Sequence, residues 1–176
     1  FSYCLFNEPR YDDRSKYSLG KFHDWMRAKH GTIALLNKRH NASYQSFEDL
    51  PAPKGETVSA LWYDWARFNQ ERFGAVHEWV SDSIHALDPG TPVHSKVQSM
   101  LFDTRRVFSS GIDHEQWASQ GDISGNDNYG YYRKGAKGYS ANWLRQSMYY
   151  NFQRSVAPNR PIFNSENHPI EDNGAY

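Results

Sequence analysis

Apolar residues in this sequence fall into short continuous runs and into longer stretches with helical spacing. A short apolar run covers residues 1–6 and stops at the polar sequence Asn-Glu-Pro at residues 7–9, which is the pattern of a buried strand with a polar end. Runs of the same kind at residues 91–97, 122–125 and 161–165 predict further strands. The pattern therefore predicts strands spread along the whole chain.

Other stretches have apolar residues at three- and four-residue steps, which is the spacing of amphipathic helices. The first covers residues 18–30, where Ser18 is the expected N-cap and Gly31 the expected end. The most regular stretch runs from residue 61 to residue 87 and ends at the helix-breaking sequence Asp-Pro-Gly. The last predicted helix covers residues 140–152.

Strands and helices alternate along most of the chain, which is the order typical of α/β architecture. Residues 32–58 interrupt this order, and because they are polar and contain prolines we expect an excursion without a core element. Polar residues follow each predicted strand at its carboxyl end, where parallel barrels build their active sites. The sequence therefore predicts consecutive βα units with a site along one edge of the sheet.

The composition excludes several classes of function. The 20 Lys plus Arg residues are balanced by 20 Asp plus Glu residues, so the basic excess typical of nucleic-acid binding is missing. A single cysteine, Cys4, excludes a disulfide framework, and the scattered histidines form no zinc-binding motif. No apolar run has the length of a membrane span. We therefore expect no nucleic-acid or membrane partner and no metal, while secreted, periplasmic and cytoplasmic locations all stay open.

Aromatic residues make up 16% of the chain, which is a large share for a core of this size. Flat amphipathic rings stack on the apolar faces of sugars and bases. This composition favours a cleft lined by rings. The alternative is that the rings replace aliphatic side chains in the core.

Two glutamates directly follow predicted strands, Glu8 in Asn-Glu-Pro and Glu166 in Asn-Ser-Glu-Asn-His-Pro. In a parallel barrel both would lie at the edge that carries the active site. Cleavage of a glycosidic bond with retention needs one protonated carboxyl group and one carboxylate, about 5 to 5.5 Å apart. The sequence provides such a pair, although a glutamate at a strand end is also commonly a solvated residue.

The sequence Phe-Asn-Glu-Pro at residues 6–9 resembles the acid/base signature at the end of the fourth strand in the large clan of retaining glycoside hydrolases with a (β/α)8 barrel. Glu166 falls where that clan has its nucleophile, at the end of the seventh strand. Residues 22–50 are similar to the segment after the acid/base strand in family 42 β-galactosidases and related agarase-like enzymes. The resemblance implies that residues 1–176 form a single partial TIM-barrel domain of the α/β class, strands four to seven with their helices, truncated at both ends.

The same resemblance implies roles for residues at the strand ends. Glu8 would be the general acid/base, Glu166 the nucleophile, and Asn7 a donor to the sugar 2-hydroxyl group. The acid/base role requires Glu8 to carry a proton when substrate binds, while Glu166 must be ionised.

Other candidates for substrate binding follow the later strands. Tyr129 resembles the clan tyrosine that hydrogen-bonds the nucleophile, with Asp127 and Asn128 as alternatives at that position. Lys96 or Gln98, near the end of the second predicted strand, is a candidate for contact with a sugar hydroxyl or carboxylate group, although such residues are more commonly solvated. His168 is expected beside the nucleophile, or else in an ordinary loop.

The predicted function is the hydrolysis of a β-glycosidic bond by a retaining double displacement without a cofactor. A β-galactoside or a galactose-containing glycan is the favoured substrate, and the expected partners are this carbohydrate and the missing half of the barrel, supplied by a longer chain or by a second copy. The alternative is a non-catalytic carbohydrate-binding or scaffold module with an aromatic rim, which does not need both carboxylates in one cleft.

Overall fold

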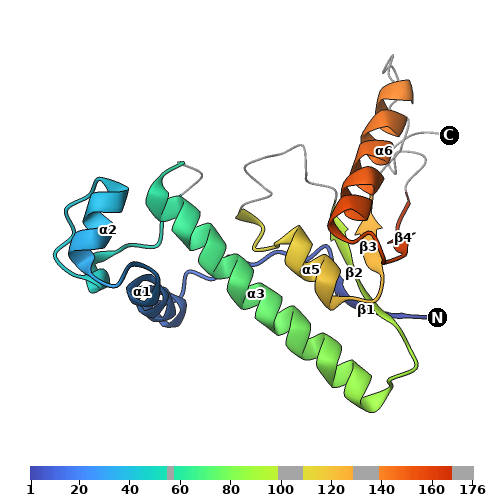
Figure 1. The fold of residues 1–176 in the computed structure, drawn as a ribbon, viewed down its shortest axis with the longest axis horizontal. Helices are drawn as coiled ribbons and strands as arrows, with labels where there is room; N and C mark the ends of the chain where they lie inside the picture. Colours follow the sequence, from blue (N-terminus) through green and yellow to red (C-terminus); the bar gives the residue numbers. More distant parts are fainter. Residues whose placement is uncertain (55–57, 99–108, 129–138, 168–176) are drawn as a thin grey trace. The chain divides into compact units, whose positions relative to one another are not determined.

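A computed structural model describes residues 1–54, 58–98, 109–128 and 139–167 (Figure 1). The chain divides into two compact units. We call them the sheet unit, which contains Phe1–Pro9, Gly74–Thr104 and Asp113–Tyr176, and the helical unit, which contains Arg10–Phe73 and Arg105–Ile112.

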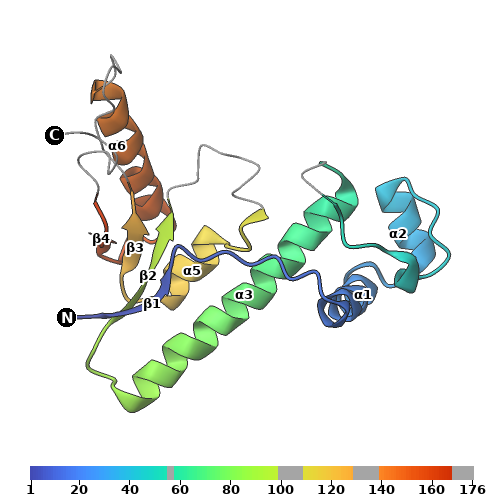
Figure 2. The ribbon, with the colours of Figure 1, turned by 180° about the vertical axis from the view of Figure 1, so that it is seen from behind.

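The sheet unit is built on a parallel sheet with the strand order β1-β2-β3-β4. Its strands lie side by side in the order of the chain (Figure 2). A doubly wound sheet reverses its strand order at a switch point, whereas a barrel keeps chain order. The strands are β1 (Tyr3–Asn7), β2 (Val93–Gln98), β3 (Ser124–Asp127) and β4 (Ile162–Asn164).

The predicted strands are confirmed, but β3 begins two residues later than expected. The expected strand at 122–125 is shifted because Asp122 is bound to the start of β2, where its carboxylate accepts a hydrogen bond from the Val93 N–H at 2.9 Å. The predicted long helix and last helix are also confirmed, as α3 (Ala60–Leu87) and α6 (Tyr139–Val156).

One face of the sheet is covered by helices of the sheet unit. Gln153 of α6 hydrogen-bonds both Ser124 and Asn126 of β3 at 3.1 and 3.0 Å. His77 of α3 contacts the Ser95 hydroxyl group of β2 at 2.9 Å. Side chains alternate along a strand, so the residues between these positions face the opposite side of the sheet.

A further helix of the sheet unit, α5 (His114–Gln120), was not predicted. Asp113 caps its start by accepting hydrogen bonds from the N–H groups of Glu115 and Gln116. The helix is short and buries only Trp117 and Ala118, so it has no repeating apolar pattern in the sequence.

The helical unit corrects the expectation for residues 32–58. They contain α2 (Ile33–His40) and the short 3-10 helix η1 (Phe47–Asp49), and they contribute to the core instead of lying outside it. The helix α2 buries only one residue, so its periodicity is too weak to detect. The buried core of this unit consists of Phe22, Met26, Leu36, Phe47, Leu50, Trp65 and Phe68.

The first helix, α1 (Lys16–His30), ends at Gly31 as predicted but begins earlier. Gly31 has a φ of 77°, a backbone conformation that glycine adopts without a steric penalty. The N-cap is Ser15, whose hydroxyl group accepts a hydrogen bond from the Ser18 N–H, so the expected N-cap at Ser18 is wrong. Ser18 instead lies buried within the helix and accepts a hydrogen bond from Arg72 at 2.8 Å.

In the part of the chain that the structure describes, no helix combines the length and the apolar character needed to cross a membrane.

Candidate active site

Four charged side chains lie at or just beyond the carboxyl ends of the parallel strands. They are Glu8 after β1, Lys96 in β2, Asp127 at the end of β3 and Glu166 after β4, and we call them the strand-end cluster. Lys96 and Asp127 share the face of the sheet opposite the helices, because their strand neighbours Ser95 and Asn126 contact helices. The edge of the sheet that was predicted to carry a site therefore holds three carboxyl groups and one lysine.

Glu8 stands at a sharp change of chain direction. Its φ is 45°, in the left-handed region that costs a non-glycine residue on the order of 1–2 kcal/mol. The Glu8 N–H donates a hydrogen bond to the Lys96 carbonyl oxygen at 2.9 Å, which ties this turn to β2. The register of β1 against β2 shifts between Cys4 and Asn7, directly before the turn. The backbone is thus held in an uncommon conformation at the predicted acid/base residue.

Asp127 is fully buried and lies beside Glu8. Burial, together with the hydrogen bond to Glu8 and the charge of Glu8, raises the pKa of Asp127 to about 8. The positive charge of Lys96 acts against this rise. At neutral pH the Asp127 carboxyl group is therefore predominantly protonated.

Glu166 forms an ion pair with Lys96. The Lys96 side chain is only 11% exposed and that of Glu166 is 34% exposed, so water screens this pair only partly. The Glu166 N–H donates a hydrogen bond to the Asn164 side-chain oxygen at 3.3 Å, which links the residue back to β4. A nearby ammonium group favours the ionised form of a carboxylate, which is the form a nucleophile needs.

The structure joins four of the predicted site residues by direct contact: Glu8 with Asp127, and Lys96 with Glu166. Asn7 is the last residue of β1 and is exposed, in register with Lys96. Tyr129 and His168 lie outside the described residues. The expected spacing of the two glutamates stays a prediction.

A buried amide network behind β3 was not anticipated from the sequence. The Asn128 side chain donates to the Gln146 carbonyl oxygen at 3.0 Å, and the Gln146 side chain donates to the Asn128 carbonyl oxygen at 3.1 Å. Asn164 of β4 also donates to the Asn128 carbonyl oxygen, at 2.9 Å. Gln146 and Gln153 are seven residues apart on one face of α6, and that spacing is the signal that could have revealed it. The network fixes the ends of β3 and β4 next to the strand-end cluster.

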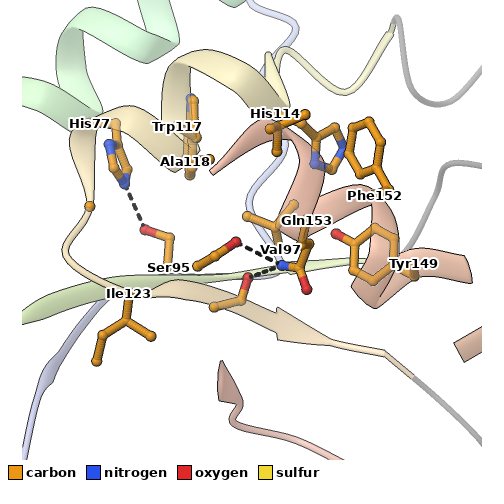
Figure 3. A pocket seen from close by; sticks show the side chains of 14 residues that line it. His77, Ser95, Val97, His114, Trp117, Ala118, Ile123, Tyr149, Phe152 and Gln153 are labelled. Carbon is orange, nitrogen blue, oxygen red and sulfur yellow. Dashed lines mark hydrogen bonds between the residues drawn. The ribbon is translucent and has the colours of Figure 1, made fainter. Parts of the chain in front are cut away.

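A small cavity lies on the helix side of the sheet (Figure 3). Its volume is about 20 Å³, enough for one water molecule. His77 contacts Ser95 on one side and Gln120 on the other, at 2.9 and 3.0 Å, and His114 is so deeply buried that the pKa of its ring falls to about 4. This cavity is a feature of the core and is too small for a sugar.

The helical unit contains the one His and carboxylate cluster with the spacing of a metal site among the described residues, formed by His30, His40 and Asp64. Both histidines approach one Asp64 oxygen through Nε2, at 2.8 and 3.0 Å. Lys29 binds the other Asp64 oxygen at 2.6 Å, and Arg39 contacts His30 Nδ1 at 3.2 Å. Lys29 already neutralises the carboxylate, and the positive charge of Arg39 beside His30 also disfavours a divalent ion, so the cluster is explained as a buried hydrogen-bond network.

Comparisons with known proteins show the family and the fold to which this chain is similar. The model of glycoside hydrolase family 42, described as β-galactosidase, matches residues 3–174. An apo exo-carrageenase GH42 from Bacteroides ovatus is similar with 26% identity and a TM-score of 0.75, over 99% of this chain and 27% of that chain. A cold-adapted β-galactosidase from Rahnella sp. R3 is similar with 22% identity and a TM-score of 0.76, over 96% and 25% of the two chains.

An agarase is more distantly similar, with 16% identity and a TM-score of 0.57, over 86% of this chain and 19% of that chain. No curated protein matches the chain. The chain spans about a quarter of the length of the first two solved structures. Its parallel strands and helices form part of a (β/α)8 barrel, as predicted from the sequence.

Proposed function

Because the chain belongs to glycoside hydrolase family 42, the β-galactosidases, we propose that it carries the catalytic carboxylates of a retaining β-glycosidase. The observation that supports this proposal is the strand-end cluster. It holds two glutamates at the ends of parallel strands, one hydrogen-bonded to a buried acid and the other paired with a lysine. These two environments suit two different tasks, proton transfer and nucleophilic attack.

The proposed reaction has two displacements. Glu8 gives a proton to the leaving oxygen while the Glu166 carboxylate attacks the anomeric carbon and forms a glycosyl ester. Glu8 then removes a proton from water, the water oxygen attacks the same carbon, and Glu166 leaves as a carboxylate. Two inversions give net retention of configuration.

The proposed substrate is a β-galactoside or a galactose-containing glycan. This choice rests on the description of the family as β-galactosidase and on the similarity to solved β-galactosidases. Asn7 is exposed at the end of β1, next to Glu8, and is the proposed donor to the sugar 2-hydroxyl group.

The two roles are separable by substitution in the full-length enzyme. Glu166→Ala should abolish turnover of every β-galactoside, because no covalent intermediate can form. Glu8→Ala should spare the first step for an activated aryl galactoside, whose leaving group needs no proton. Steady-state kinetics with a dinitrophenyl and an alkyl galactoside measure the difference, and Glu78→Ala, at an exposed position of α3, is the matched control.

Azide distinguishes the assignment from its reverse. In the Glu8→Ala enzyme azide should restore turnover and give the β-glycosyl azide, because it attacks the glycosyl ester from the face that water uses. In the Glu166→Ala enzyme azide can only displace the leaving group directly and give the α-glycosyl azide. The opposite pairing of variant and product would show that the two roles are exchanged.

A further inference from the structure

Asp127 has an unusual position for an acidic residue. Its side chain has no exposed surface, and it is hydrogen-bonded to a second carboxyl group, that of Glu8. A carboxylate has no proton to donate, so a hydrogen bond between two carboxyl groups requires a proton on one of them. Two ionised carboxylates in such direct contact, one of them fully buried, would repel each other strongly.

The other ionisable groups near Asp127 do not remove the need for a proton on one of the two carboxyl groups. Lys96, from β2, is the cation that acts on Asp127, but its ammonium group is also bound to Glu166. Burial, and to a smaller extent the nearby Asp127, raises the pKa of the Tyr149 hydroxyl group of α6, so this group stays neutral. Counted over its four described members, the strand-end cluster has three carboxyl groups and one ammonium group, and one bound proton brings their summed charge closer to zero.

We propose that Asp127 and Glu8 share one proton in the free enzyme, which makes Asp127 the positioning residue that keeps a proton available at the acid/base group. This inference rests on the acid/base role proposed above for Glu8. The raised pKa of Asp127, about 8, agrees with a pair that still holds its proton at neutral pH. The two groups titrate as a pair, so the proton belongs to both.

The charge of the cluster stays constant through the proposed reaction. In the first step the shared proton passes to the leaving oxygen as its bond to the anomeric carbon breaks, and Glu166 becomes an uncharged ester. Glu8 and Asp127 are then both ionised, and Lys96, whose partner Glu166 is now an uncharged ester, balances one of their two negative charges. In the second step water supplies a hydroxyl group to the anomeric carbon and a proton to the pair, and Glu166 returns to Lys96 as a carboxylate.

The pH dependence of the full-length enzyme tests the pair. Asp127→Asn keeps the size and a hydrogen-bond donor but cannot ionise. For an alkyl galactoside, which needs protonation, the basic limb of the kcat/KM profile should move to lower pH by at least about one unit, which is about a tenfold loss of rate on that limb. For a dinitrophenyl galactoside the variant should change by less than about threefold. Asp82→Asn, at an exposed position of α3, is the matched control.

An unchanged basic limb in Asp127→Asn overturns the inference. Infrared spectroscopy of the substrate-free enzyme gives a readout that does not need activity or a stable Asp127 variant. The wild type should show a carboxylic-acid carbonyl band that disappears as the pH rises through about 8, and Glu8→Gln should lose this band at lower pH.

The two measurements also separate this inference from the proposed function. If Glu8→Ala is inactive toward alkyl galactosides and the wild type has no such band, the shared proton is wrong and the acid/base role stands. If the band is present but Glu8→Ala keeps full activity, the acid/base role is wrong, and the catalytic part of this inference is overturned with it.

Discussion

At the scale of single residues, three carboxyl groups of the strand-end cluster have the same chemistry but different surroundings. Glu8, Asp127 and Glu166 are all carboxyl groups, yet one is half-buried at a strained turn, one is fully buried beside another acid, and one is paired with a lysine. The sequence alone marks all three as polar residues near strand ends. The different tasks proposed for them rest on burial and on the partner that each one meets.

The raised pKa of Asp127 gives a stability that depends on pH. Folding raises this pKa from 3.8 to about 8, so the stabilising effect is complete below pH 3.8 and is lost as the pH rises to about 8. Asp127→Asn removes this dependence. The free energy of unfolding of the variant, relative to that of the wild type, should therefore increase by up to about 1.4 kcal/mol for each pH unit in that interval.

Urea unfolding of both full-length proteins at pH 5, 6, 7 and 8 measures this difference, and titrating groups that do not interact with Asp127 cancel in the comparison. A difference in the free energy of unfolding that stays the same at all four pH values would show that Asp127 ionises normally in the folded protein.

At the scale of secondary structure, long elements follow the sequence pattern and short elements depend on individual contacts. The helix α3 has 28 residues, so its apolar period is repeated often enough to identify it. The helices α2 and α5 have 8 and 7 residues, and they are held by caps and by one or two buried side chains. Two serines near the start of α1 are both suitable N-cap residues, and only the structure shows that Ser15 is the N-cap.

The cap of α1 is testable by substitution. Ser15→Ala removes the acceptor for the Ser18 N–H and should lower the free energy of unfolding by about 1 kcal/mol, whereas Ser15→Gly should lower it by a few tenths. Thermal or urea unfolding measures both effects, with Ser43→Ala at an exposed position as control. Equal losses for alanine and glycine would contradict the assignment of Ser15 as the cap.

The site was predictable from the sequence only in part. Glu8 and Glu166 were identifiable because each follows an apolar run directly. The contact between Glu8 and Asp127 was not, since it depends on the turn at Glu8 and on how β3 is aligned with its neighbours. The ion pair of Lys96 with Glu166 likewise joins residues 70 positions apart, and no local pattern encodes it.

At the scale of the whole molecule, the described strands form one continuous arc of a barrel. Parallel strands in chain order bring the ends of β1 and β4 to the same edge, although two strands lie between them. The curvature of a closed barrel carries side chains at such ends toward one another across its mouth. Half of a (β/α)8 barrel therefore has enough strands to hold both proposed catalytic carboxylates.

A crystal structure of the full-length enzyme tests this geometry. The nearest carboxylate oxygens of Glu8 and Glu166 should lie about 5 to 5.5 Å apart, the separation that a retaining mechanism needs. A separation above roughly 9 Å, or side chains on opposite faces of the sheet, would contradict a retaining pair.

The left-handed turn at Glu8 has an evolutionary consequence. Glycine would form this turn without strain, so the requirements of the fold alone favour glycine at position 8. If the proposed role of Glu8 is right, selection on its carboxyl group keeps a glutamate at this position in spite of the strain. In relatives that lack the hydrolytic role proposed here, we expect glycine or asparagine at position 8 more often than alanine. The residue at this single position would then separate active from inactive descendants.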